Sequence, residues 1–547
     1  MNLIENLKLS FNNFLIKNFP DSQQIKNYEF ELNTDESKKE FGDLNSNAAM
    51  ILAKELKKNP KEIANLITTK FSDKFVKKIE IAGPGFLNFF LTDEAFIELT
   101  KELYDQKENF FKLDKNSKKY NYNVEFVSAN PTGPLHIGHG RGGIIGDVLS
   151  NVLKFLGHNV TKEFYINDAG NQIQKLGLSL KIRCEQILGK EINLPEDGYQ
   201  GEYLINLAKE CIKEFGKNVI EKPSEFFEDY AKEKLLQAIK QTLSEYGIIF
   251  DVWFSEKSLH ENGSVEKSIK KLIELGETYE QEGALWFKST TYGDDKDRVL
   301  KKSNGELTYV ASDIAYMQSK IERGSNYLVM VLGQDHHSYV VRLHGIQKAL
   351  KLDKYPLDII LYQLVKIKEG GQFVKLSKRA GKIITLKDII ETVGKDVARF
   401  FYLNRKADAQ LELDLDLALK KTDENPVYYV QYAYVRINSI LEKAKDENIK
   451  FDINDASNIA NEEFFLIKKI VSLKNMLENI SHNHQTHLLA YYLIELATIF
   501  HRYYYNHRII DPQNIEKSKA RLLTISLLKD TFQTGLKLLG ISQPERM

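Results

Sequence analysis

The chain has 547 residues, of which 42% are hydrophobic and 28% are charged. This length exceeds what one hydrophobic core normally serves, so we expect roughly two to four domains. The 76 basic and 76 acidic residues give a formal net charge of zero, which neither supports nor excludes a nucleic-acid partner, because a local basic face is sufficient for binding.

The cysteine content and the amino terminus limit the class of protein further. Only Cys184 and Cys211 are present, and they form no CxxC pair, so neither a disulfide framework nor a protein-bound zinc is expected. Residues 1–17 read as an amphipathic helix, because they carry Glu5 and lack a small-residue cleavage site. No run approaches about 20 apolar residues. The sequence therefore predicts a cytoplasmic protein without a membrane partner.

Residues 1–110 are predicted to form a small N-terminal α/β domain. Residues 45–67 place apolar side chains at helical spacing. Two short β-prone runs within residues 77–91 flank Gly83-Pro84-Gly85, which is a turn signal. The polar stretch 105–121 is the expected linker.

Residues 115–405 are predicted to form a domain around a parallel sheet, because strand candidates alternate with helical segments. The segment from 170 to 300 mixes charged helices with loops, and we expect it to be an insertion into that sheet. The strand candidates are residues 122–129, 158–168, 326–335 and 357–367, with a helix expected over 138–156.

Residues 406–547 change to a helical pattern, which predicts an all-α domain of the bundle type. The expected helices are residues 427–444, 462–480, 488–509 and 516–539.

The densest chemical signal follows the first strand candidate and opens the helix after it. Helix N-termini present free N–H groups and a positive dipole end, so they bind phosphate well. Glycines let a ligand approach the backbone, and His136 and His139 can donate hydrogen bonds to phosphate oxygens. A lone HxxH pair is more often an ordinary polar turn. The predicted ATP-binding run is Ala129, Asn130, Pro131, Thr132, Gly133, Pro134, Leu135, His136, Ile137, Gly138 and His139.

Two motifs resemble those of class I aminoacyl-tRNA synthetases. In its strand–loop–helix setting, His136-Ile137-Gly138-His139 resembles the HIGH motif. Lys375-Leu376-Ser377-Lys378-Arg379 resembles the KMSKS-type loop, with Leu376 and Arg379 departing from that pattern. A basic run alone is usually solvated surface, but a flexible cationic loop can close over a triphosphate. The resemblance implies that His136, His139 and Lys378 are catalytic and that Lys375 and Ser377 contact ATP.

Further segments resemble the arginyl-tRNA synthetase family, and the resemblance covers nearly the whole chain. They are residues 124–130, 167–172, 293–300, 308–316, 333–337 and 538–547. The family implies a Rossmann-like catalytic domain, an N-terminal domain that contacts tRNA and a helical anticodon-binding domain. It also implies activation of arginine with ATP, transfer to tRNA(Arg), Mg²⁺ carried in with ATP, and a monomeric protein.

A guanidinium substrate needs a fixed carboxylate, because its planar fork pairs bidentately with one. By position in the family motif, Asp313 is the first choice, with Tyr309 beside it. The resemblance implies that Glu125, Asn130 and Gln334 hold the α-amino and carboxylate groups, and that Gly333 and His336 join the ATP site. The structural alternative is that Asp313 caps a helix and Glu125 pairs with a lysine.

Aromatic and basic residues occur together in the C-terminal helices, which resemble an anticodon-binding domain. Unstacked bases are read by stacking on aromatic rings and by hydrogen bonds to their edges. Tyrosines at helical spacing are more often core than base platforms, so that alternative stays open. The candidate tRNA contacts are Tyr429, Tyr432, Arg436, Tyr504, Arg508 and Met547.

Three other functions remain open at this point. One is a class I synthetase for cysteine or another basic amino acid, although the scarcity of cysteines disfavours a Cys-ligated zinc enzyme. The second is a smaller HIGH-type nucleotidyltransferase, which would leave the C-terminal helices without a purpose. The third is a catalytically dead tRNA-binding relative, against which the intact His136, His139 and Lys378 argue.

Overall fold

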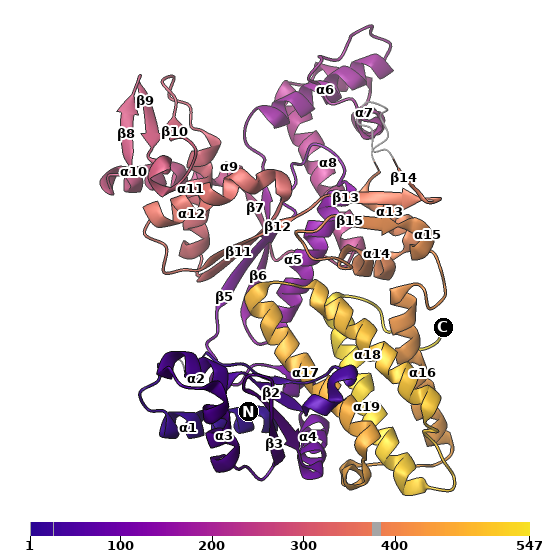
Figure 1. Cartoon of the computed structure of the whole chain (residues 1–547). Helices are drawn as coiled ribbons and strands as arrows, with labels where there is room; N and C mark the ends of the chain where they lie inside the picture. Colours follow the sequence, from indigo (N-terminus) through magenta and orange to yellow (C-terminus); the bar gives the residue numbers. More distant parts are fainter. Residues whose placement is uncertain (1, 24, 26, 375–383) are drawn as a thin grey trace.

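The computed structural model describes residues 2–547 except 24, 26 and 375–383 (Figure 1). In this view the α/β domain lies at the top, and the N-terminal domain and the C-terminal helices lie side by side below it. The KMSKS-type segment predicted from the sequence falls outside the described residues.

The N-terminal domain packs helices against an antiparallel sheet with the strand order β1-β2-β4-β3. The Phe11 ring lies at its centre, 5.3 Å from that of Phe89. The helix predicted over 45–67 is two helices, because Asn59 caps a new one and Pro60 occupies its first turn. The elements are α1 (Leu3–Asn18), β1 (Phe30–Leu32), η2 (Glu36–Phe41), β2 (Leu44–Ser46), α2 (Ala48–Leu56), α3 (Pro60–Lys70), β3 (Val76–Ala82), β4 (Phe86–Leu91), α4 (Asp93–Gln106) and η3 (Lys107–Phe111).

The central sheet has five parallel strands in the order β12-β11-β5-β6-β7. The chain leaves β5 toward one side of the sheet and β11 toward the other, so a topological switch point lies between them, where sheets of this kind bind ligands. The sequence predicted four of these strands and missed the four-residue β7. The elements are β5 (Asn121–Phe126), α5 (Ile137–Phe155), β6 (Asn159–Ile166), β7 (Val252–Ser255), α11 (Tyr309–Glu322), β11 (Tyr327–Gly333), η6 (Gln334–His336), α12 (His337–Ala349) and β12 (Leu357–Tyr362).

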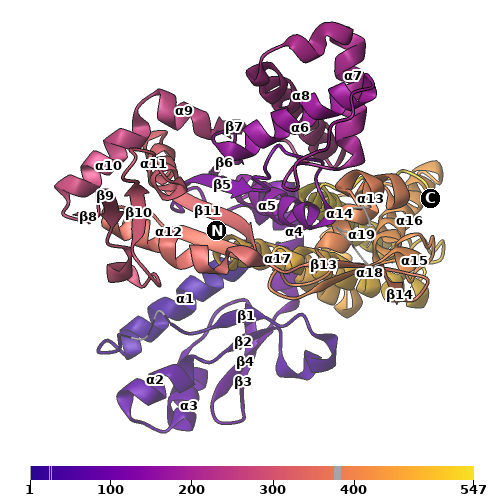
Figure 2. The ribbon, with the colours of Figure 1, turned by 90° about the horizontal axis from the view of Figure 1, so that it is seen from above.

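Two insertions project from this sheet as separate lobes (Figure 2). Helices α6–α8 form the first, between β6 and β7. The second follows β7 and carries a small antiparallel sheet of order β10-β9-β8. The elements are α6 (Asn171–Ile187), α7 (Glu202–Phe215), η4 (Lys217–Glu221), α8 (Ser224–Glu245), α9 (Glu256–Glu261), α10 (Ser264–Glu274), β8 (Thr278–Gln281), β9 (Ala284–Phe287), η5 (Ser289–Tyr292) and β10 (Arg298–Lys301).

A second small sheet, of order β14-β13-β15, leads to the C-terminal helices. Its strand β15 pairs in parallel with β13. This sheet therefore continues past residue 405, where the sequence predicted the α/β domain to end. The elements here are β13 (Val365–Glu369), β14 (Gln372–Phe373), α13 (Leu386–Val393), α14 (Lys395–Tyr402), β15 (Leu411–Asp414) and α15 (Leu415–Ala418).

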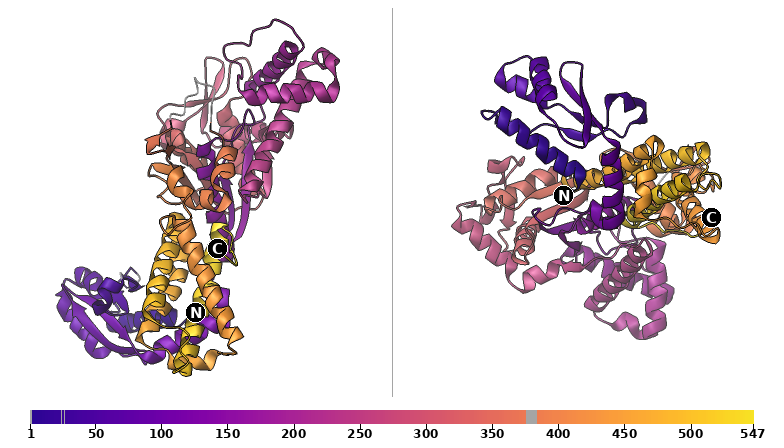
Figure 3. Two further views of the ribbon diagram at one scale, coloured as in Figure 1. Left: turned by 90° about the vertical axis from the view of Figure 1, so that its right-hand side faces the viewer. Right: turned by 90° about the horizontal axis from the view of Figure 1, so that it is seen from below.

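The C-terminal helices form the predicted bundle (Figure 3). Its elements are α16 (Pro426–Asp446), η8 (Ile453–Asn458), α17 (Asn461–Asn483), α18 (His487–Asn506) and α19 (Ile515–Leu539). The N-terminal domain docks on α17, where Phe96 and Phe464 stack 4.4 Å apart and Lys468 pairs with Asp43 at 2.8 Å. Across the described ranges, no helix has the length and apolar character needed to cross a membrane.

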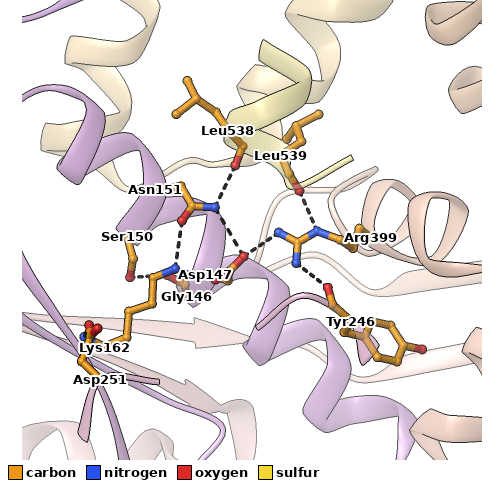
Figure 4. A network of polar contacts seen from close by, with 10 residues as sticks. All are labelled: Gly146, Asp147, Ser150, Asn151, Lys162, Tyr246, Asp251, Arg399, Leu538 and Leu539. Atoms are coloured by element: carbon orange, nitrogen blue, oxygen red, sulfur yellow. Dashed lines mark hydrogen bonds and ion pairs between the residues drawn. The ribbon is translucent and has the colours of Figure 1, made fainter. Parts of the chain in front are cut away.

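A buried network joins the bundle to the helix that follows β5 (Figure 4). Arg399 of α14 pairs with Asp147 of α5 and donates to the Leu539 carbonyl at 2.7 Å and to the Tyr246 carbonyl at 2.8 Å. Lys162 of β6 reaches the other oxygen of Asp147 at 2.7 Å. Because Leu539 ends α19, one guanidinium ties the end of the bundle to the core of the α/β domain.

Candidate active site and RNA-facing surface

The chain turns sharply where β5 ends. The Ser128 N–H donates to the Phe126 carbonyl at 3.0 Å, and Val127 between them has a φ of +67°. Such a γ-turn is strained for a β-branched residue and costs roughly 1–3 kcal/mol. Two contacts offset this strain, because Ser128 Oγ donates to Glu125 Oε1 at 3.0 Å and accepts from the Tyr165 N–H at 3.1 Å. The turn fixes the direction in which the loop between β5 and α5, residues 130–135, leaves the sheet.

His136 is the N-cap of α5, and His139 lies in its first turn. Nδ1 of His136 accepts from the Gly138 N–H at 3.1 Å, and Nδ1 of His139 accepts from the His136 N–H at 3.2 Å. A backbone N–H can only donate, so in the neutral form each ring carries its proton on Nε2. Burial, together with the adjacent His136, lowers the pKa of His139 to about 3. His139 is therefore a neutral Nε2–H donor at pH 7.

The glycines of α5 let the helix pack closely against its neighbours. A Cβ on Gly140 would lie 2.5 Å from Leu386, one on Gly142 would lie 2.5 Å from Tyr362, and one on Gly146 would lie 2.3 Å from Phe126. These three glycines follow the predicted ATP-binding run of residues 129–139 and lie against protein side chains, so their lack of a side chain serves the packing of the helix. The close packing arises because α5 is a buried helix that lies between β5 and α13–α14.

The chain returns to the histidines just after residue 383. Thr385 forms an isolated antiparallel bridge with His136, and the Leu386 N–H donates to the Leu135 carbonyl at 2.7 Å. The predicted ATP contacts Lys375, Ser377 and Lys378 lie outside the described residues. Thr385, which follows these residues in the chain, therefore pairs with His136.

Asp313 lies one turn inside α11, whose N-cap is Thr308, so the alternative that Asp313 caps this helix is excluded. Burial raises the pKa of Asp313 to about 7. The hydroxyl of Tyr339 on α12 donates to the carboxylate and opposes this rise, whereas the neighbouring Glu256 adds to it. The charge of Arg342 also favours the ionised form, but burial outweighs it, so this carboxylate is only partly ionised at neutral pH.

Glu256, at the start of α9, is a site residue that the sequence did not indicate. Its side chain is buried, and burial raises its pKa even though the hydroxyls of Ser312 and Tyr165 donate to it. It lies in a charged insertion without a recognisable motif, and only the fold brings it to Asp313. The site therefore holds two neighbouring carboxylates that both favour a cationic ligand.

Glu125 pairs with Lys320, as the structural alternative predicted. Lys320 Nζ lies 2.6 Å from Glu125 Oε2, and both side chains are almost completely buried. Lys320 belongs to the same face of α11 as Asp313, because seven residues make about two helical turns. Glu125 is thus a carboxylate held by Lys320 and Ser128 at the carboxyl end of β5, between the loop of residues 130–135 and α11.

The other predicted contacts lie around the carboxyl edge of the sheet. Tyr309 is 58% exposed, and its hydroxyl lies 3.5 Å from the place a Cβ on Gly170 would occupy, so it extends toward the loop after β6. Asn130 is exposed in the loop after β5. Gly333 ends β11, Gln334 begins η6 half-buried, and His336 precedes α12 and is exposed.

On the bundle, Tyr432, Arg436 and Tyr504 form one exposed aromatic patch. The Arg436 guanidinium lies 4.5 Å from the Tyr432 ring centroid and 4.8 Å from that of Tyr504. Tyr428 and His501 stack against Tyr432, with their ring centroids 6.3 and 5.8 Å from that of Tyr432. These rings come from α16 and α18, which the sequence could not show to be neighbours.

The remaining predicted tRNA contacts do not all belong to this patch. Tyr429 is half-buried against His501. Arg508 supports a turn, because its Nε donates to the Ile510 carbonyl at 3.1 Å. Met547 is 48% exposed at the end of a segment that Gln431 binds through the Ser542 carbonyl at 3.2 Å. Tyr505, which was not predicted, is 88% exposed beside Tyr504.

Among the described residues, no group of three or more His, Cys, Asp or Glu side chains could hold a metal ion. Cys184 and Cys211 are both buried and free of disulfides.

Three family models match the chain. "Arginyl tRNA synthetase N terminal domain" matches residues 5–91, and "tRNA synthetases class I (R), catalytic domain" matches residues 99–464. "DALR anticodon binding domain" matches residues 430–547. The second of these alone spans more than half of the chain.

Curated relatives match over the full length. An "Arginine--tRNA ligase" of Caldanaerobacter subterraneus is 42% identical, with 100% of each chain covered. An "Arginine--tRNA ligase 1" of Halalkalibacterium halodurans is 44% identical over 93% of each. Among solved structures, "Thermus thermophilus arginyl-tRNA synthetase" superposes with a TM-score of 0.78 at 20% identity, covering 100% of both chains, and shows the same fold.

Proposed function

The chain belongs to the arginyl-tRNA synthetase family, and from that premise we propose how its side chains carry out the reaction. It is a class I aminoacyl-tRNA ligase that activates arginine with ATP and transfers it to tRNA(Arg). A carboxylate oxygen of arginine attacks the α-phosphorus, and pyrophosphate leaves. The hydroxyl of the 3′-terminal adenosine then attacks the arginyl carbonyl, and AMP leaves. Positioning and charge stabilisation supply the catalysis, because no protein nucleophile is needed.

The ATP phosphates bind at the start of α5. His136 and His139 donate Nε2–H bonds to phosphate oxygens, which requires the tautomer that their Nδ1 contacts select. Because His139 is neutral, it stabilises charge as a dipole and takes no proton away from the reaction. Lys375, Ser377 and Lys378 supply cationic and hydroxyl contacts from the KMSKS-type segment.

The guanidinium of arginine binds between Asp313 and Glu256. A guanidinium offers donors on several edges and can serve two carboxylates at once, which an ammonium cannot do in the same plane. A bound cation also shifts Asp313 toward its ionised form, because it adds opposite charge to that of the nearby Arg342. Tyr309 covers this side of the substrate.

The α-amino and carboxylate groups of arginine lie nearer the sheet edge. Glu125 accepts from the α-ammonium, and Asn130 and Gln334 fix the carboxylate that attacks ATP. Glu125 suits this role because Lys320 binds one of its oxygens and Ser128 fixes the other. Gly333 and His336 line the ATP side of the same edge.

The tRNA anticodon binds the exposed aromatic patch of the bundle, where Tyr432 and Tyr504 offer rings to unstacked bases and Arg436 offers a cation. Tyr429, Arg508 and Met547 are secondary candidates. Residues 1–110 form the further tRNA-contacting domain, residues 115–405 the catalytic domain and residues 406–547 the anticodon-binding domain. We further propose a monomer that works in the cytoplasm and receives Mg²⁺ bound to ATP.

The observation that carries this assignment is the pair formed by the half-buried Asp313 and the buried Glu256, which the fold brings together near the carboxyl edge of the sheet. The test is pyrophosphate exchange dependent on an added amino acid, measured with and without tRNA(Arg). We expect arginine to support exchange, and lysine and citrulline to fail. A dead tRNA-binding relative would show no exchange under either condition.

A further inference from the structure

The loop between β5 and α5, residues 130–135, is held from outside by two remote segments. The Leu386 N–H donates to the Leu135 carbonyl at 2.7 Å. The Tyr203 hydroxyl donates to the Thr132 carbonyl at 2.6 Å. Tyr203 is in the first turn of α7, so the second anchor comes from the inserted helical lobe rather than from the sheet domain.

The insertion is shaped around this contact. A Cβ on Gly201 would lie 2.4 Å from the Tyr203 ring, so the ring can take its place only because residue 201 is glycine. On the other side, the ring lies 3.5 Å from the position of a Cβ on Gly133. The same ring packs against the apolar core of α6–α8. Tyr203 therefore joins the core of the inserted lobe to the loop of residues 130–135.

From these contacts we propose that Tyr203 is a positioning residue for adenylate formation, which anchors the loop that leads into His136 and couples its place to that of the α6–α8 lobe. The loop needs such an anchor because it has no regular secondary structure and starts from the strained turn at Val127. The inference rests on the proposed role of this loop in binding ATP.

Tyr203→Phe tests the proposal in the full-length protein, because it removes the hydroxyl and keeps the ring. In arginine-dependent pyrophosphate exchange we expect kcat/KM for ATP to fall roughly three- to tenfold, the loss typical of one hydrogen bond. The KM for arginine should change much less, since Asp313 and Glu256, which are proposed to bind the guanidinium, lie on α11 and α9 outside this loop, and Asn130 is the loop's one residue assigned to arginine. Gly201→Ala should lower kcat/KM for ATP in the same way, because the methyl group displaces the ring.

Tyr230→Phe is the matched control, because its hydroxyl donates to Glu214 at 3.1 Å within the same lobe. It should change neither KM. The proposal is overturned if Tyr203→Phe leaves kcat/KM for ATP within twofold of the wild-type value, or if the KM for arginine rises equally. His136→Ala is measured in parallel. If it too leaves exchange unchanged, the proposed role of the whole loop fails, whereas a defect in His136→Ala alone removes only the role of Tyr203.

Discussion

The two regions that face substrates are built in opposite ways. Around the end of β5 the polar side chains are held in place by protein partners, as in the buried Glu125–Lys320 pair and in His136 and His139, which stack on each other and accept hydrogen bonds from backbone N–H groups. On the bundle, the rings of Tyr432 and Tyr504 are exposed, and the half-buried Arg436 lies against both.

This difference follows from what each region must recognise. Charge that develops during adenylate formation is stabilised best by dipoles fixed in advance in a dry site. Recognition of unstacked bases needs only accessible rings and nearby cations, because the stacking interaction forms when the base binds. Substitutions in the first region should therefore disturb the fold or the chemistry, and substitutions in the second should disturb RNA binding alone.

The largest effect is expected at the Arg399 network, which supports the catalytic helix from behind. Arg399→Ala removes one of the two cations that pair with the buried Asp147 carboxylate. It also leaves the Leu539 and Tyr246 carbonyls without this donor, and should lower the free energy of unfolding by about 3–5 kcal/mol in urea denaturation. Arg436→Ala, at a half-buried position on the bundle surface, is the control and should change the free energy of unfolding by less than about 0.5 kcal/mol. Equal losses of unfolding free energy in the two variants would contradict the contrast between the two regions.

The same network affects whether the α/β domain can fold without the C-terminal helices. A chain that ends before residue 410 loses the Leu538 and Leu539 carbonyls that Asn151 and Arg399 bind. The helical composition of the C-terminal region suggests a separable domain, whereas these contacts make the end of α19 part of the α/β core.

His136→Ala and His139→Ala should slow adenylate formation in single-turnover assays by the equivalent of about 2.7–4 kcal/mol, the usual cost of one fixed donor to a transition state. The affinity for arginine should change far less. Near-normal single-turnover rates in both variants would remove these rings from the phosphate site.

On the bundle, Tyr432→Ala should weaken tRNA(Arg) binding by about 1–3 kcal/mol if one base stacks on this ring. The melting temperature should stay close to that of the wild type, because the ring is exposed. An unchanged Kd for tRNA in a filter-binding assay would show that the patch is not the RNA contact.

The smallest effect is a pH dependence of arginine binding. The pKa of Asp313 is raised to about 7, and arginine needs the ionised carboxylate, so affinity is present above pH 7 and is lost as the pH falls through that value. About one tenth of the carboxylates are ionised at pH 6, which corresponds to a roughly tenfold higher KM for arginine. A KM that stays flat between pH 6 and pH 8 would contradict this assignment.

Contiguous patterns could be predicted from the sequence. The strand–loop–helix around residues 126–137, four of the five parallel strands and the four long helices of the bundle follow from local periodicity and turn chemistry. The start of α5 at Ile137 agrees with the motif because capping is a local event.

Long-range pairings could not be predicted in this way. Lys320 reaches Glu125, and Glu256 reaches Asp313, only after the sheet has formed. The role of Gly146 also depends on the Phe126 ring beside it. Composition carries no record of such partners, and β7 is too short to give a periodic signal.

The central claim is that Asp313 reads the guanidinium, and Asp313→Asn tests it because it keeps the shape of the side chain and removes its charge. Arginine-dependent pyrophosphate exchange should fall at least roughly a hundredfold, equivalent to about 2.7 kcal/mol. Discrimination against citrulline, the neutral analogue, should narrow at the same time. If both the KM for arginine and the citrulline ratio stay at their wild-type values, the guanidinium is recognised elsewhere, and the account is contradicted.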